Sequence, residues 1–157
     1  MISQLVKIKK IKADRAEHAL RKQQQVLAQA NIRLNQANHE AYDYRLWRKE
    51  EEQRLFSQAK ESSLKLKELE QLQQHIAILH DKEANLKQEA AEIELKRDSE
   101  QEALNLCQKA ALLANKAIEK FELLQQQADI EQEYLTQYQE EIEQEDRRIM
   151  ATGELIC

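Results

Sequence analysis

The sequence predicts an all-α fold: two long helices packed as an antiparallel coiled-coil hairpin, the second helix longer than the first. The 157 residues include no proline and one glycine, Gly153, so the strongest helix breakers are absent before that position. Hydrophobic residues make up 41% of the chain and charged residues 34%, a composition typical of coiled coils rather than of layered domains. Apolar residues also recur in one heptad pattern along most of the chain.

The heptad pattern keeps a single register, in which Leu20 occupies position a. The a series reads Val6, Ala13, Leu20, Leu27, Leu34, Ala41, Arg48, Leu55, Ser62, Leu69, Ile76, Glu83, Ala90, Arg97, Leu104, Ala111 and Ile118. The d series reads Ile2, Lys9, Ala16, Gln23, Ala30, Ala37, Tyr44, Glu51, Gln58, Lys65, Leu72, Leu79, Leu86, Ile93, Glu100, Cys107, Ala114, Phe121, Ala128, Leu135, Ile142 and Ile149. A repeat of about 3.5 residues indicates left-handed winding around a partner helix, from another chain or from the same chain folded back.

The first helix is predicted over residues 3–57 and a turn over residues 58–63. The seam is polar at Arg48, Glu51, Gln58, Ser62 and Lys65, so little would hold two helices together there. Serines in the segment SQAKESS bond readily to nearby backbone groups, and Ser62 or Ser63 is placed to cap a second helix.

The second helix is predicted over residues 64–150, followed by a frayed tail over residues 151–157, all within one domain of residues 1–157. Position a faces d across an antiparallel pair, which sets Tyr44 opposite Ile76, Leu34 opposite Leu86 and Leu27 opposite Ile93. In this pairing the second helix continues beyond the first from about Ile118 to Met150.

Two rival arrangements also fit the heptad pattern. A turn between Ala77 and Ile78 would lay the basic residues 1–22, with seven basic and two acidic side chains, beside residues 129–146, with eight acidic and no basic side chains. It would, however, put apolar Ile76 and Leu79 into a loop. The other rival is one unbroken helix in a long parallel dimer.

A cluster of bulky side chains falls outside the seam in the segment DYRLWRKEEEQRLF and at Tyr42, which directly precedes it. In the heptad register Tyr42 and Phe56 occupy b, Leu46 occupies f and Trp47 occupies g, so a second helix would leave them uncovered. These four residues are the predicted partner-binding site. The alternative interpretation is that Trp47 and Phe56 cover the open end of the coil at the turn.

The sequence offers no chemistry of catalysis, and we expect no enzyme, no cofactor and no metal site. The four histidines lie too far apart for a triad on one helix, and His75 and His80 miss the i, i+4 spacing of a helical metal pair. The net charge of −5 argues against nucleic acid. Two cysteines form no disulfide framework, and no apolar run suggests membrane insertion or a signal peptide, so a cytoplasmic location is expected.

Several segments, in this order, resemble the YscO family of type III secretion proteins, whose flagellar relative is FliJ. They are Tyr44, Leu46, Trp47 and Arg48, then EEQRLF, LCQK and YQEEIEQE. The resemblance implies a cytoplasmic helical hairpin, similar to the central stalk of rotary ATPases, at the base of the secretion apparatus. It also implies three partners: the hexameric export ATPase, the cytoplasmic domain of the export gate and the chaperones of secreted substrates.

From this resemblance we expect a monomer that acts as a stalk in the ATPase ring and links the ring to the gate. Two alternatives remain open at this point. One is a chaperone-escort adaptor that never enters the ring, and the other is a structural coiled-coil spacer.

Overall fold

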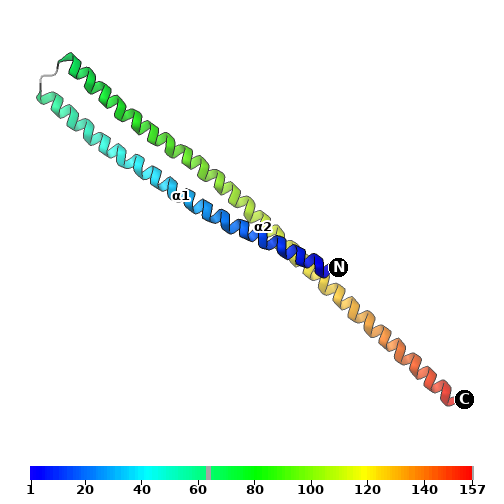
Figure 1. Cartoon of the computed structure of the whole chain (residues 1–157). Helices are drawn as coiled ribbons and strands as arrows, with labels where there is room; N and C mark the ends of the chain where they lie inside the picture. The colour runs from blue at the N-terminus through cyan, green and yellow to red at the C-terminus, as the bar shows by residue number, and fades with distance from the viewer. Residues whose placement is uncertain (63–64, 157) are drawn as a thin grey trace. The chain divides into compact units, whose positions relative to one another are not determined.

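The computed structural model describes residues 1–62 and 65–156, with side chains described as far as Gly153. Helix α1 spans Ile2–Glu61, 60 residues, and helix α2 spans Leu66–Ile156, 91 residues (Figure 1). No strand occurs in these ranges. The predicted fold class is confirmed: two helices, with the longer second helix packed antiparallel against the first.

The chain divides into two compact units. We name Ala19–Gln108 the hairpin unit, and Met1–His18 together with Lys109–Cys157 the terminal unit. Each unit contains one stretch of α1 and one stretch of α2.

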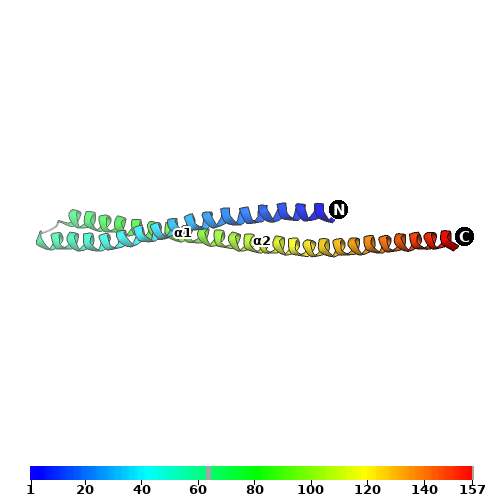
Figure 2. The same ribbon diagram turned by 90° about the horizontal axis from the view of Figure 1, so that it is seen from below.

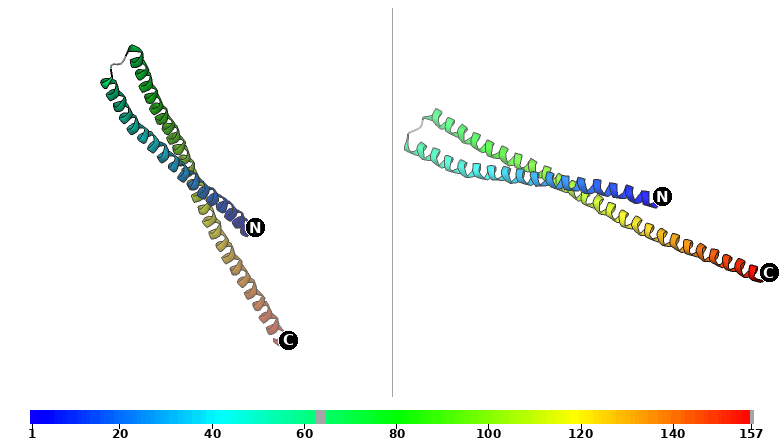
Figure 3. Two further views of the ribbon diagram at one scale, coloured as in Figure 1. Left: turned by 60° about the vertical axis from the view of Figure 1, so that its left-hand side comes forward. Right: turned by 60° about the horizontal axis from the view of Figure 1, so that its bottom comes forward.

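In the hairpin unit α1 and α2 lie side by side and run in opposite directions, as Figures 2 and 3 show from several sides. Near its beginning, Gln23 donates hydrogen bonds from Nε2 to the backbone carbonyl of Glu100 at 3.1 Å and to its carboxylate at 2.6 Å. Closer to the turn, the hydroxyl of Tyr44 donates to the carbonyl of Leu79 at 3.2 Å. Later residues of α1 therefore contact earlier residues of α2, as expected of an antiparallel pair.

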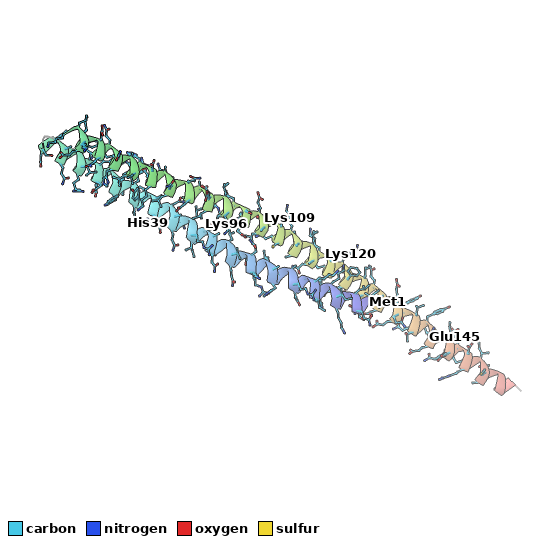
Figure 4. All side chains as sticks on the ribbon, turned by 45° about the horizontal axis from the view of Figure 1, so that its top comes forward. Met1, His39, Lys96, Lys109, Lys120 and Glu145 are labelled. Carbon is cyan, nitrogen blue, oxygen red and sulfur yellow. The ribbon has the colours of Figure 1, made fainter. Side chains whose placement is uncertain are left out.

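In the terminal unit the first turns of α1 pack against the middle of α2. Nζ of Lys10 lies 3.6 Å from a carboxylate oxygen of Glu122, and the Lys9 ammonium lies 5.4 Å from the ring centroid of Phe121. Figure 4 shows Met1 close to the stretch of α2 that follows Lys120, with Glu145 further along α2. From Glu131 to Gly153 every described side chain is exposed.

Burial follows the predicted heptad register in both units. Every buried residue that the structure describes occupies position a or d. The buried residues are Val6, Ala13, Leu34, Arg48, Leu79, Glu83, Ala90, Leu104 and Ala111. Because the apolar stripe of each helix packs against one other helix, all remaining positions stay at least partly open to water.

The turn lies later than predicted. Residues 58–61 are still helical in α1, and α2 begins at Leu66. The backbone N–H and hydroxyl of Ser62 both bond to the carbonyl of Gln58, at 3.1 and 2.9 Å, so Ser62 ends α1 rather than capping α2. Ser63 lies outside the described residues.

The later turn displaces the predicted pairing toward the C-terminus of α2. Tyr44 bonds to Leu79 rather than facing Ile76, and Arg48 pairs with Glu83. In the terminal unit the half-buried stretch of α2 accordingly extends from Ile118 to Ala128, so the part without a partner helix begins about ten residues later than expected.

Neither rival arrangement is present. Ala77 and Ile78 lie inside α2, where Ile78 is exposed, so the turn predicted from charge is wrong. Individual surface ion pairs are weak, whereas burying Ile76 and Leu79 is worth roughly 1.5–3 kcal/mol per fully buried side chain. The reversal of the chain also rules out a single unbroken helix, and α2 continues through Ile156, past the predicted end at residue 150.

Candidate partner-binding surface

All four residues of the predicted partner-binding site lie exposed on α1 of the hairpin unit. The exposed fractions are 58% for Tyr42, 44% for Leu46, 47% for Trp47 and 50% for Phe56. Isolated exposed apolar residues are ordinary, but large side chains gathered on one helix segment are typical of binding surfaces.

Three of the four side chains form a stripe along one face of α1, and Trp47 lies beside this exposed stripe. At 100° per residue, Tyr42, Leu46 and Phe56 share one face of α1, and exposed Lys49 and Gln53 lie between Leu46 and Phe56. Trp47 points to the side, where its ring centroid lies 5.5 Å from that of Tyr44 at an interplanar angle of 41°. Tyr44 thus connects the exposed tryptophan to the seam.

Tyr44 is held in place from the α2 side. Its hydroxyl donates to the Leu79 carbonyl, and the Lys82 ammonium lies 5.2 Å from its ring centroid. Burial raises the pKa of the Tyr44 phenol; the nearby charge of Arg48 acts against this rise and that of Glu83 adds to it. The phenol therefore stays protonated at neutral pH and keeps its role as a hydrogen-bond donor.

On the seam side of α1 lies a polar cluster that joins the two helices, formed by Arg48 and Glu52 of α1 with His80 and Glu83 of α2. Arg48 and Glu83 are buried, Glu52 is half-buried and His80 is exposed. Arg48 and Glu83 are only 8% and 6% exposed. The Arg48 guanidinium contacts the Glu83 carboxylate through Nε, although Nε lacks the alignment of a hydrogen bond, and Nη1 lies 3.0 Å from Glu52.

His80 contacts the Glu52 side of this polar cluster, and two cations lie on its Glu83 side. Nε2 of His80 contacts the Glu52 carboxylate and lies 3.4 Å from Nη1 of Arg48. On the Glu83 side, Lys87 lies at 3.3 Å and Arg45 at 4.0 Å. Burial alone raises the pKa of Glu83, but the hydrogen bond from Lys87 and the charges of Arg48 and Lys87 outweigh it and lower that pKa overall.

Sequence reasoning found the exposed residues of this region and missed the buried ones. Arg48 and Glu83 both stood at position a, one on each predicted helix and with opposite charges, which is a signal for a pair across the seam. From the polar seam at Arg48 alone we expect a weak point between the helices, whereas the structure has a charge pair there. Glu52 and His80 both lie at e positions, which flank the seam and commonly form polar pairs between helices, so the register itself offered a signal for this contact.

Among the described residues, no group of three or more His, Cys, Asp or Glu side chains is placed to hold a metal ion. Cys107 is a half-buried free thiol at position d. In the same ranges, neither helix holds a stretch with the length and apolar character that a membrane span requires.

Comparison with known proteins places this helical pair in a defined class. A family model described as "Type III secretion protein YscO" matches residues 2–148. The Yop proteins translocation protein O of Yersinia pseudotuberculosis serotype I (strain IP32953) is 42% identical over 121 residues, which are 77% of this chain and 79% of that protein. The 2.8 Å crystal structure of the type III secretion protein YscO from Vibrio parahaemolyticus has a TM-score of 0.85 and 46% identity, covering 93% of this chain and 92% of that one.

The helical fold and the matches to known proteins together identify the class of protein: a helical component of type III secretion. The chain belongs to the YscO family, and the resemblance predicted from its sequence is thereby confirmed.

Proposed function

We propose that this chain is a non-enzymatic stalk of the type III export ATPase, acting in the cytoplasm at the base of the secretion apparatus. As a monomer it links the hexameric ATPase ring to the cytoplasmic domain of the export gate and binds substrate chaperones. The proposal combines the family membership with the translocation role in the name of the Yersinia relative.

One observation carries the stalk proposal: each unit is only two helices thick, and outside positions a and d no described residue is buried. A stalk inside a ring must present side chains to subunits on all sides. A two-helix coil does so, whereas a globular domain hides much of each element in its own core.

We assign the terminal unit to the ATPase ring, because it combines the basic start of α1 with a stretch of α2 that lacks a partner helix. The exposed stripe of the hairpin unit is then the surface for the export gate or a chaperone. In this assignment Tyr42, Leu46, Trp47 and Phe56 bind a partner protein.

The test is the ATP hydrolysis rate of the purified cognate ATPase with increasing amounts of this chain. We expect the rate to rise and to saturate below one chain per ATPase subunit, because a single stalk serves a whole ring. An unchanged rate, together with no binding to the cytoplasmic domain of the gate, contradicts the proposal.

A chaperone-escort adaptor that stays outside the ring is the second candidate, favoured by the exposure of Trp47 and Phe56. Replacing both with alanine should abolish capture of secretion chaperones. Ile32→Ala is a matched control, because Ile32 is an exposed apolar residue of the same helix and unit. If the wild-type chain captures chaperones but never raises the ATPase rate, the adaptor role replaces the stalk.

A further inference from the structure

The last third of α2 carries an apolar stripe that no helix of the terminal unit covers. Its members are Leu135 and Ile142 at position d, Tyr138 at position g, and Ile149 at position d, with exposed fractions of 55%, 40%, 54% and 69%. Their spacings of three, four and seven residues place them on one face of the helix, as in a coiled-coil seam.

This uncovered stripe is turned relative to the seam of the hairpin. Position a, apolar in most earlier heptads, is occupied here by Gln132, Gln139 and Asp146, while position g supplies Tyr138. The apolar face thus runs along d, with Tyr138 beside it at g. Such a face indicates a helix partner that approaches from a direction different from that of α1.

Carboxylates lie within this same face. Glu131 and Glu145 occupy position g on either side of Tyr138, and Glu141 and Asp146 border the stripe. All four are exposed, and an approaching apolar helix would strip water from Glu131 and Glu145 without replacing their hydrogen bonds. A covering helix must therefore bring cations to these positions.

The start of α1 does not cover the stripe. Its contacts end on earlier residues of α2: Glu17 accepts from Asn115 at 3.5 Å, and Lys9 and Lys10 meet Phe121 and Glu122. Val6 is already buried in the same seam. Lys9 and Lys10 are thus used on earlier residues of α2, before the stripe begins.

A second copy of the same stripe is a poor occupant. A parallel arrangement would set Glu131 against Glu131 and Glu145 against Glu145, two like-charge contacts inside the interface. An antiparallel arrangement would bring these carboxylates against apolar side chains such as Ile149 and Leu135 and leave them unpaired. The acidic charge of residues 129–146 equally disfavours an anionic membrane surface.

We propose that residues 131–149 dock a basic amphipathic helix of another protein, which packs apolar side chains along Leu135, Tyr138, Ile142 and Ile149. Lys or Arg side chains of that helix pair with Glu131 and Glu145 across the interface. The inference goes beyond the stalk proposal, because it defines the chemistry of the partner segment whichever protein supplies it.

The experiment uses the full chain and a designed 21-residue peptide with Leu at a, Ile at d and Lys at e and g. A second peptide has Glu in place of every Lys. Binding is measured by fluorescence anisotropy of the labelled peptides. We expect the basic peptide to bind, the acidic peptide not to bind, and the affinity of the basic peptide to fall as salt rises.

Variants of the chain test whether the basic peptide binds at the stripe. Tyr138→Ser with Ile142→Ser should weaken the basic peptide at least about tenfold, since two apolar contacts are lost. Glu131→Gln with Glu145→Gln should weaken it and flatten its salt dependence. The control is Leu113→Ser, which changes a 66% exposed leucine of α2 in the same unit but off the stripe. Circular dichroism checks that all variants keep the helical content of the wild type.

Three outcomes overturn the proposal. The first is equal binding of the basic and acidic peptides, and the second is equal loss of affinity in the Leu113→Ser control. The third is self-association of the wild-type chain that Ile142→Ser abolishes, since a second copy would then occupy the stripe. None of these outcomes bears on stimulation of the ATPase, so the stalk proposal stands or fails on its own test.

Discussion

Arg48 and Glu83 occupy positions where a coiled coil ordinarily places aliphatic side chains. Removing two charges from water is costly, and a buried ion pair often contributes less to stability than a well-packed apolar pair of the same volume. Here the charges are matched by Glu52 on one side and by Lys87 and Arg45 on the other. Losing one member should therefore harm the fold more than losing both.

Glu83→Leu alone should lower the free energy of unfolding by about 2–4 kcal/mol, because it leaves the Arg48 guanidinium buried beside one carboxylate. Adding Arg48→Leu should recover most of this loss, since two leucines pack in the same seam. Urea unfolding followed by circular dichroism measures both values. If the free energy of unfolding of the double variant falls by the sum of the losses measured for Glu83→Leu and Arg48→Leu alone, the two residues do not stabilise the fold as a pair.

The lowered pKa of Glu83 makes the hairpin sensitive to acid. Because the folded pKa lies below the unfolded one, the unfolded chain binds the proton more readily, and stability rises with pH through this window. The contribution is complete above the ordinary carboxyl pKa of about 4.3 and is lost as pH falls through the folded value. Arg48, Arg45 and Lys87 are the charged groups facing Glu83.

We therefore expect the melting temperature of the wild type to drop more steeply below about pH 4.5 than that of Glu83→Gln, which cannot ionise at this position. Thermal melts from pH 7 to pH 3 give the comparison. The difference between the two proteins isolates Glu83 from the other carboxylates of the chain. Parallel curves at all pH values contradict a stabilising role of the ionised carboxylate.

At the scale of the helices, the apolar seam alone fits more than one pairing of α1 with α2. A displacement by one heptad again matches a with d, and the observed contacts of Tyr44 and Arg48 are displaced from the expected pairing toward the C-terminus of α2. In the observed pairing Arg48 meets Glu83. We infer that this charge pair selects the register, a role that polar residues at position a fulfil in other coiled coils.

Moving the acidic residue back by one heptad, with Ile76→Glu and Glu83→Leu, should shift the pairing toward the turn. Spin labels at exposed Ile32 and Ile78, in a chain whose native cysteines are replaced by serine, measure the change. A seven-residue slip should shorten the label separation by on the order of 10 Å. Glu83→Leu alone is the control, because it creates no new partner for Arg48. An unchanged separation in the double variant shows that the apolar contacts set the register.

The sequence was sufficient to predict helices and the heptad register, because the apolar side chains alone define the seam. The antiparallel hairpin was favoured over its rivals by the polar stretch of the seam near residues 58–63, since little would hold two helices together there. The sequence was not sufficient to predict the offset between the helices, which depends on a buried charge pair and on where α1 ends. Ser57 to Glu61 contain neither glycine nor proline, so no strong helix breaker marked where α1 ends. The exposure of Tyr42, Leu46 and Phe56 followed from the register, whereas the contacts of Glu52 and His80 required the structure.

For the whole chain, stability should be distributed unevenly between its parts. Helical segments in water are marginal unless an apolar face packs against another element. The segments that contain Leu34 to Arg48 and Leu79 to Ala90 pack in this way, whereas residues 131–153 have only exposed side chains. Local opening of this last segment should therefore cost little free energy.

Hydrogen exchange followed by mass spectrometry should accordingly show residues 131–153 exchanging at least about tenfold faster than residues 34–48 and 79–90. A basic helical peptide added in excess should slow exchange in the fast segment and leave the other two unchanged, because it supplies the missing apolar contacts there. The acidic peptide serves as the control. If residues 131–153 of the free chain exchange as slowly as the buried segments, this part of α2 is stable without a partner helix. Its exposed apolar stripe then gives no reason to expect a docked helix.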